Sequence, residues 1–321
     1  MRTKIYGTLG PSCCKADLLR EMIAQGMSGV RLNLSHVSLA DSKEWLDEWQ
    51  AASQGKYDLL IDMQGPEMRI EKLDEVLQFE AGDQMEVPIP GRVLPFLEED
   101  KEVLLDDGKI LARVLSVDER GARLLMLRAG ELSGGKSIKI PNVENTLSAL
   151  TEHDLENLSL AKESGVTGVM QPFVRGAEDL REVRQALANA GAPDIRIFAK
   201  IENRRGMEKF DEILSEADWI VIARGDLGND MPLWELPVAQ KKIAEQCSKK
   251  GVPFIVVTQM LASMEHSPVP TRAEVSDIAR AVWEQAGGVM VTGETAVGEY
   301  PVEVMKYLVN TVAAAEKVCR H

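Results

Sequence analysis

Short apolar segments alternate with longer amphipathic segments along most of the chain. The apolar segments are four to six residues long and rich in aliphatic side chains, as expected for parallel strands buried on both faces. They lie at residues 3–8, 29–33, 57–62, 166–171, 195–200, 218–223, 253–257 and 288–291. Amphipathic helical stretches lie between them, for example at 16–26, 38–53, 151–164, 176–190, 234–250, 273–286 and 301–318. Eight strand–helix units in one run favour a (β/α)8 barrel over a doubly wound open sheet.

The helical spacing disappears between residues 70 and 140. This segment instead predicts short strands at 79–87, 103–105, 110–117 and 123–127, with turn signals between them. We therefore expect an α/β chain in which residues 1–70 and 141–321 form the barrel and residues 71–140 form a small all-β domain inserted after the third strand. Loops that follow barrel strands lie at the catalytic end of such barrels, so the insert is expected to act as a lid.

The charge and cysteine content narrow the range of partners. The 321 residues include 37 Lys+Arg and 51 Asp+Glu, which gives a net charge of −14 and argues against nucleic acid or a membrane surface as the partner. A local cluster of cations can still bind a small anion. The four cysteines show no Cys-x-x-Cys spacing, which indicates free thiols in a reducing cytosol rather than zinc ligands. With no signal sequence and no membrane span expected, we predict a cytoplasmic protein.

Polar side chains directly follow six of the predicted strands. Because strand ends of a parallel barrel meet at one mouth, we expect these side chains to converge. Glu202 and Asp226 are carboxylates with no nearby His or Cys, and such ligands suit Mg²⁺ or Mn²⁺ better than zinc. Lys200 and the amides of Gly225 and Asp226 at a helix start suit an anionic substrate. An ion pair or a turn accounts for each feature singly, but together they predict phosphoryl or enolate chemistry.

The strings at these strand ends resemble the pyruvate kinase family. They are, in the family's order, Arg31-Leu32-Asn33-Leu34-Ser35-His36, Gly65-Pro66-Glu67-Met68-Arg69, Ala199-Lys200-Ile201-Glu202-Asn203, Ala223-Arg224-Gly225-Asp226-Leu227-Gly228, Thr258-Gln259-Met260, Pro270-Thr271-Arg272 and Thr292-Gly293-Glu294-Thr295. The resemblance implies a barrel with a β lid after the third strand. It also implies transfer of phosphate from phosphoenolpyruvate to ADP, giving pyruvate and ATP, with Mg²⁺ and usually K⁺ as cofactors.

The resemblance implies a role for each matching residue. Glu202 and Asp226 would hold the divalent ion, and Lys200 would stabilise the transferring phosphoryl group and the enolate. The amides of Gly225 and Asp226, with Thr258, would hold the substrate carboxylate.

Further residues match the family's motifs in other roles. They are Arg31 as a bridge between phosphoryl groups; Asn33, Ser35, Asp62 and the carbonyl of Met63 as K⁺ ligands; His36, Arg69 and Lys136 as contacts to nucleotide phosphates; and Thr292 and Glu294 in delivery of a proton to the enolate.

The chain also departs from the family pattern. Met63-Gln64 stands where Thr-Lys is common, and the fourth strand ends in Gln171-Pro172-Phe173, where a serine is common. The family's C-terminal allosteric domain is expected to be absent. Three functions stay open: a pyruvate kinase without allosteric control, a paralogue with other metal–enolate chemistry on pyruvate, oxaloacetate or phosphoenolpyruvate (decarboxylation, aldol cleavage or a different phosphoryl acceptor), and a metabolite-binding regulator. A homo-oligomer through a barrel face is also open.

Overall fold

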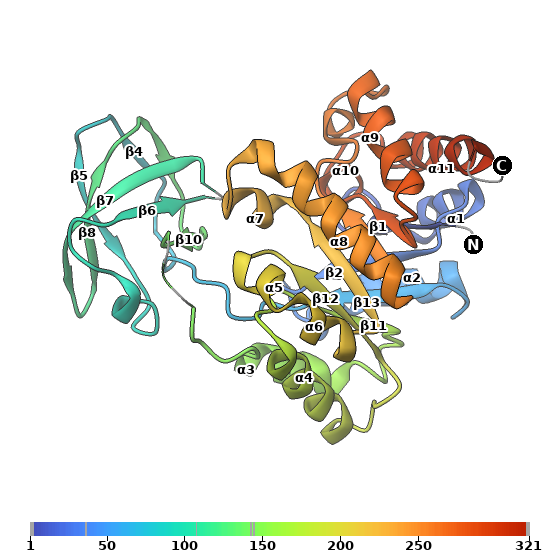
Figure 1. Cartoon of the computed structure of the whole chain (residues 1–321), viewed down its shortest axis with the longest axis horizontal. Coiled ribbons are helices and arrows are strands. Elements are labelled where there is room, and N and C mark those ends of the chain that lie inside the picture. The colour runs from blue at the N-terminus through green and yellow to red at the C-terminus, as the bar shows by residue number, and fades with distance from the viewer. Residues whose placement is uncertain (1–2, 36, 107, 142, 144, 319–321) are drawn as a thin grey trace. The chain divides into compact units, whose positions relative to one another are not determined.

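Eight parallel strands close into the barrel that the hydrophobic pattern predicts (Figure 1). The computed structural model describes residues 3–35, 37–106, 108–141, 143 and 145–318. Its barrel strands are β1 (Lys4–Thr8), β2 (Gly29–Asn33), β3 (Asp58–Asp62), β11 (Gly168–Gln171), β12 (Arg196–Ile201), β13 (Trp219–Ala223), β14 (Phe254–Val257) and β15 (Gly288–Met290). Their order around the barrel is β1-β15-β14-β13-β12-β11-β3-β2. The predicted (β/α)8 fold is confirmed, and both ends of every predicted barrel strand lie within two residues of the observed ones.

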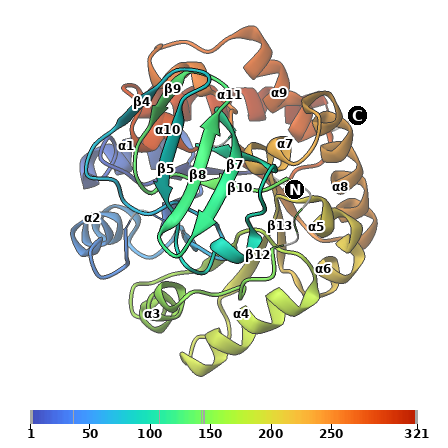
Figure 2. The same ribbon diagram turned by 90° about the vertical axis from the view of Figure 1, so that its left-hand side faces the viewer.

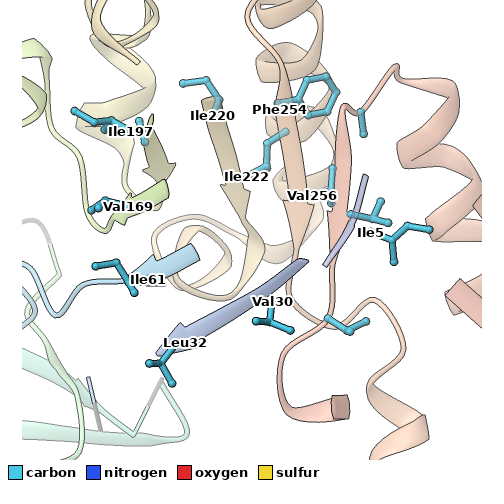
Figure 3. Packing of buried hydrophobic residues seen from close by; sticks show 14 of the residues in the cluster. Ile5, Val30, Leu32, Ile61, Val169, Ile197, Ile220, Ile222, Phe254 and Val256 are labelled. Carbon is cyan, nitrogen blue, oxygen red and sulfur yellow. The ribbon is translucent and has the colours of Figure 1, made fainter. Parts of the chain in front are cut away.

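Side chains alternate along each strand between the barrel interior and the surrounding layer of helices. The inward set forms one buried cluster: Tyr6, Leu60, Met170, Phe198, Trp219, Val221, Ala223, Ile255, Val257 and Met290. The outward set, which includes Ile5, Val30, Ile61, Val169 and Ile197, packs in a second cluster with the helices (Figure 3). Both faces of each strand are therefore apolar, which accounts for the nearly continuous apolar runs in the sequence.

Helices surround the barrel (Figure 2). They are α1 (Ala16–Gln25), α2 (Lys43–Ser53), α3 (Glu152–Leu160), α4 (Ala177–Asn189), α5 (Arg204–Glu208), α6 (Phe210–Glu216), α8 (Leu236–Lys250), α9 (Arg272–Trp283) and α11 (Pro301–Val318). Two short helices, α7 (Arg224–Asn229) and α10 (Gly293–Ala296), follow β13 and β15 directly. The predicted start of α2 at residue 38 is wrong, because Ser38 and Asp41 form a turn in which the Ser38 hydroxyl donates to the Asp41 carboxylate at 2.7 Å.

The segment between β3 and α3 forms a second compact unit, Pro66–Ser148. Its strands are β4 (Leu77–Phe79), β5 (Gln84–Pro88), β6 (Glu102–Leu105), β7 (Ile110–Asp118), β8 (Gly121–Met126), β9 (Gly130–Leu132) and β10 (Ile138–Lys139), with the short 3-10 helix η1 (Leu94–Phe96) between β5 and β6. Five strands form a sheet in the order β10-β6-β7-β8-β5, and β4 pairs with β9.

Two details of this unit differ from the sequence prediction. The single strand expected at 79–87 is split by a turn, in which the Asp83 carboxylate accepts a hydrogen bond from the Glu80 amide at 2.8 Å. The unit is also wider than the expected 71–140, because flanking side chains such as Met68 and Leu147 pack into its own hydrophobic core. Its role as a lid stays a prediction.

Two further findings concern membrane crossing and the cysteines. Within its described parts, no helix combines the length and apolarity that crossing a membrane requires. Cys13, Cys14 and Cys247 are free thiols, as predicted, whereas Cys319 lies outside the described residues. The cytoplasmic location suggested by these thiols stays a prediction.

Candidate active site

Three charged side chains share the inward face at the carboxyl ends of the barrel strands. Asp62 lies two positions after the inward Leu60 in β3, and Lys200 lies two positions after the inward Phe198 in β12. Because side chains two apart on a strand share a face, both point into the mouth of the barrel. In β2, Arg31 lies between the outward-facing Val30 and Leu32, so its side chain also points into the mouth of the barrel. The apolar strands that predicted the fold thus also determine which polar residues meet.

These side chains form one hydrogen-bonded cluster with Glu202. The Lys200 ammonium lies 3.2 Å from each carboxylate oxygen of Asp62 and 3.0 Å from Glu202 Oε1. Arg31 Nε donates to Asp62 Oδ2 at 2.8 Å. The side chains of Asp62 and Glu202 are only 2% and 1% exposed, so these charges interact away from water. The structure brings together four of the predicted site residues.

The cluster keeps Lys200 charged. Burial by itself would lower the pKa of Lys200, but the carboxylates of Asp62 and Glu202 raise it above its ordinary value. Lys200 is therefore protonated at neutral pH and presents a fixed positive charge. Such a preorganised charge can stabilise negative charge that develops during a reaction.

The positive charge of Lys200 does not fully offset the effects of burial and of the neighbouring carboxylates on Glu202. Burial raises the pKa of Glu202 above its ordinary value; Lys200 lowers it, whereas Asp226 and Asp62 raise it further. The Phe173 amide donates to Glu202 Oε2 at 2.7 Å and fixes the orientation of the carboxylate. A cation bound beside Glu202 and Asp226 would offset this accumulation of negative charge.

The donor set fits a hard divalent cation. Asp226 lies in the first turn of α7, directly after β13, and interacts electrostatically with Glu202. Among the described residues, no group of three or more His, Cys, Asp and Glu side chains has the geometry of a metal site. Mg²⁺ commonly takes one or two carboxylates and completes its shell with water and substrate oxygens. Glu202 and Asp226 match that ligand set, and nothing in it favours zinc.

The residues predicted to hold a substrate carboxylate are neighbours. A Cβ placed on Gly225 would lie 3.2 Å from Thr258 Cγ2, so the two residues are in contact. Thr258 has a φ of 80°, which is strained for a β-branched residue. Arg224 holds this conformation, because its Nη2 donates to the Thr258 carbonyl at 2.6 Å and its Nη1 donates to Asp277 at 2.5 Å. Backbone strain of this kind is concentrated at functional sites.

The predicted monovalent-cation ligands lie at the ends of β2 and β3. Asn33 pairs in register with Asp62. The Asn33 Oδ1 accepts a hydrogen bond from the Ser35 amide at 3.3 Å, and the Met63 amide donates to the Met170 carbonyl at 3.1 Å. The atoms that these four residues could offer to a cation are oxygens, which are the ligands that an alkali cation requires.

The residues predicted to deliver a proton form a tight local structure. Glu294 is 1% exposed, and its carboxylate accepts from the amide of Thr292 at 2.6 Å and from the amide of Leu261 at 3.2 Å. Glu294 therefore joins the loop after β15 to the loop after β14. The proton-transfer role of Thr292 and Glu294 stays a prediction.

Two of the predicted nucleotide contacts lie in the second unit. Arg69 forms a β-bridge with Ser137, and its Nη1 donates to the Gly135 carbonyl at 2.8 Å. Lys136 lies between these two partners in sequence and forms an ion pair with Asp106 at 2.7 Å. The structure therefore brings Arg69 and Lys136 together within that unit. The third predicted contact, His36, lies outside the described residues.

Three groups that contact the predicted site residues or the loop beside them were not predicted from the sequence. The Thr8 hydroxyl lies 3.4 Å from Arg31 Nη1, the Phe173 amide binds Glu202, and Asp154 binds the loop after β3. Thr8 ends β1 on the inward face, so the strand-end signal that identified Asp62 applies to it as well. The other two depend on backbone amides and tertiary contacts, for which the sequence has no signal.

The fold and the site define a class: (β/α)8-barrel proteins that gather cationic and carboxylate side chains at the carboxyl ends of the strands. A family model described as pyruvate kinase, barrel domain, matches residues 1–305. The chain therefore belongs to the pyruvate kinase family.

Curated relatives agree with this assignment. The pyruvate kinase of Sporosarcina psychrophila is 37% identical over 321 residues, which cover 94% of this chain and 55% of the relative. Those of Staphylococcus saprophyticus and Chlamydia muridarum are each 35% identical, cover 98% of this chain, and are themselves covered over 57% and 69% of their length. The chain thus spans between about half and two thirds of the length of these relatives.

Proposed function

We propose that the protein transfers the phosphoryl group of phosphoenolpyruvate to ADP, giving pyruvate and ATP. The observation that carries this proposal is the buried cluster of Arg31, Lys200, Asp62 and Glu202 at the mouth of the barrel, in which the carboxylates of Asp62 and Glu202 lie 3.2 Å and 3.0 Å from the Lys200 ammonium. Phosphoryl transfer requires little covalent chemistry from the protein and depends on positioning and on positive charge near the transferred group.

The proposal assigns each side chain the role that the family resemblance implies, and the positions of the side chains support it. Lys200 stabilises negative charge on the phosphoryl group as it leaves, and on the enolate oxygen that remains. Arg31 offers a planar guanidinium, which suits phosphoryl oxygens better than a point charge does. The amides of Gly225 and Asp226, beside Thr258, orient the substrate by its carboxylate.

Glu202 and Asp226 are the proposed ligands of a divalent cation, Mg²⁺ or Mn²⁺. When bound, such an ion neutralises charge on the phosphoryl and carboxylate oxygens of the substrate. The chain's own contribution is the orientation of Glu202 by the Phe173 amide, which fixes one carboxylate oxygen and leaves Oε1 facing Lys200. A requirement for K⁺ at Asn33, Ser35, Asp62 and Met63 is part of the same proposal.

A coupled assay tests the proposal. The chain is incubated with phosphoenolpyruvate, ADP, Mg²⁺ and K⁺, and pyruvate is measured with lactate dehydrogenase while ATP is measured separately. We expect equal, saturable formation of both products. Binding of phosphoenolpyruvate and Mg²⁺ without any ATP would contradict the proposal. Decarboxylation of oxaloacetate or aldol cleavage in the absence of ATP formation would instead support a paralogue with other metal–enolate chemistry.

A further inference from the structure

Asp154 makes more contacts than the capping of a helix requires. It is the third residue of α3 and is fully buried, with 0% exposure. Its carboxylate accepts from the amide of Thr151 at 2.9 Å and its amide donates to the Thr151 hydroxyl at 3.1 Å, which together form a capping box. The carboxylate also accepts from the Thr151 hydroxyl at 2.8 Å. It also accepts from the amides of Gln64 at 2.8 Å and Gly65 at 2.9 Å, which lie 90 and 89 positions away in the sequence.

Gln64 and Gly65 are the last residues of the barrel unit before the chain enters the inserted unit, and Ala149 is the first residue after it returns. We call Gln64–Gly65 the outgoing segment and Ala149–Thr151 the returning segment. Asp154 therefore binds both segments at once. An ordinary capping residue would bind only the returning one.

Gln171 binds the same region from the end of β11. Its Nε2 donates to the Ala149 carbonyl at 2.8 Å, and the side chain is 0% exposed. Its Oε1 is buried with no hydrogen-bond partner among the described residues, an arrangement that folded proteins generally avoid. The next residue, Pro172, packs against Gly65 so closely that a Cβ there would lie 2.5 Å from Pro172 Cγ.

The outgoing segment is directly connected to the candidate active site. Asp62 and Met63 precede it without a break, and Asp62 holds both Arg31 and Lys200. A displacement of the Gln64 amide would therefore be transmitted through two peptide units to the carboxylate that orients Lys200. Hydrogen bonds to a carboxylate are shorter and stronger than those between neutral groups, so the bonds from the Gln64 and Gly65 amides oppose such a displacement.

We propose that Asp154 and Gln171 form a clamp that holds the outgoing and returning segments together and thereby positions Asp62 in the active site. Asp154 is the principal positioning residue, and Gln171 is the second anchor. The effect on catalysis rests on the proposed function, whereas the clamp itself is a property of the folded chain. The two can therefore be tested separately.

Hydrogen exchange on the free protein tests the clamp without reference to activity. In the wild type, we expect the amides of Gln64 and Gly65 to exchange as slowly as the amides within β3. Asp154→Asn keeps the size of the side chain but leaves only one oxygen to accept hydrogen bonds. We expect exchange at these two amides to become at least about tenfold faster, since a net hydrogen bond corresponds to roughly that factor.

Asp179→Asn is the matched control. Asp179 is also the third residue of its helix, α4, and is 9% exposed, but its carboxylate binds Arg175, which has no predicted role at the site. We expect this variant to leave exchange at Gln64 and Gly65 unchanged. Unchanged exchange in a folded Asp154→Asn protein, or equal acceleration in both variants, would overturn the proposal.

The kinetic consequence is measured under saturating phosphoenolpyruvate and ADP. We expect Asp154→Asn to lower kcat about tenfold while Asp179→Asn keeps the wild-type kcat. A wild-type kcat in an Asp154→Asn protein with accelerated exchange would overturn the link from the clamp to Asp62. If no variant and no wild-type sample forms ATP, the proposed function fails, and the exchange result still decides whether the clamp exists.

Gln171→Met keeps the test decisive if Asp154→Asn does not fold. Methionine retains the length of the side chain and removes the donor to the Ala149 carbonyl. We expect faster exchange at the Gln64 and Gly65 amides here too, by a smaller factor, because Asp154 remains. Rapid exchange of these amides in the wild type would by itself overturn the clamp.

Discussion

Asp58 offers a sharp test of how the barrel is held together at the end opposite the candidate active site. It lies two positions before the inward Leu60, and its carboxylate accepts from Lys4 Nζ at 2.7 Å, Arg196 Nη2 at 2.6 Å and the Tyr6 hydroxyl at 2.9 Å. Asp58→Asn removes the charge while keeping the shape of the side chain. The variant therefore isolates the contribution of the ionic contacts to the stability of the barrel.

The expected loss follows from the contacts. A hydrogen bond to a charged group is worth about 1.5–3 kcal/mol. Two such bonds come from cations that are themselves 38% and 32% exposed and that regain hydration when the carboxylate is lost, so the low end of the range applies to each. We expect Asp58→Asn to lower the free energy of unfolding by about 3 kcal/mol at pH 7.

The loss of unfolding free energy caused by Asp58→Asn should become smaller at low pH. Burial alone would raise the pKa of Asp58, but the hydrogen bond from Lys4 and the charge of Arg196 bring it below the ordinary value of 3.8. The carboxylate therefore contributes its full stabilisation above about pH 4 and loses it as the pH falls through the pKa of the folded state. The difference between wild type and variant should be constant from pH 7 to pH 5 and should shrink below pH 4.

Tryptophan fluorescence during denaturant unfolding provides the assay. All five tryptophans lie outside Pro66–Ser148, so the signal follows the barrel unit alone. Asp47→Asn is the control, because Asp47 forms an exposed ion pair with Lys43 and its side chain is 68% exposed; its effect should stay within about 0.5 kcal/mol. A loss below about 0.5 kcal/mol for Asp58→Asn, or a loss that does not change with pH, would refute the reasoning.

Two further predictions concern the metal ligand and the packing of a loop. Glu202→Gln removes one of two proposed carboxylate ligands, so we expect Mn²⁺ to bind at least about tenfold more weakly by electron paramagnetic resonance; unchanged affinity would exclude Glu202 as a ligand. Gly10→Ala would place a Cβ 2.5 Å from the backbone carbonyl oxygen of Ala296, which cannot move as a side-chain end can. We expect a loss of about 2 kcal/mol in fluorescence-monitored unfolding, and a stability equal to wild type would show that the loop after β1 is not tightly packed there.

The barrel could be predicted from the sequence because its strands are buried on both faces. Apolar runs such as 218–223 are typical of parallel strands when a helical pattern follows each one. The errors in the predicted helix and strand ends occur where local polar contacts override the spacing of apolar residues. Ser38 and Asp41 close a turn that the apolar spacing of 38–53 does not reveal, and the Asp83 carboxylate ends β4 after Phe79.

The charged part of the site was also predictable, and its fine structure was not. Lys200 and Asp62 follow apolar strands directly, so the alternation of side chains in a barrel brings them together. The contacts of Asp154 to Gln64 and Gly65 join segments about ninety positions apart and use backbone amides, which every residue except proline possesses. The Thr151-x-x-Asp154 capping-box pattern indicates that a helix starts after Thr151, but it cannot reveal what else the Asp154 carboxylate binds.

The central claim is that Lys200, held protonated by Asp62 and Glu202, provides the positive charge for phosphoryl transfer. The most direct measurement compares wild type, Lys200→Met and the exposed-site control Lys43→Met at saturating phosphoenolpyruvate, ADP and Mg²⁺. We expect wild type and Lys43→Met to form ATP and pyruvate in equal amounts at equal rates. In folded Lys200→Met, we expect both products to form about 10³-fold more slowly. ATP formation by Lys200→Met at the wild-type rate would contradict the claim.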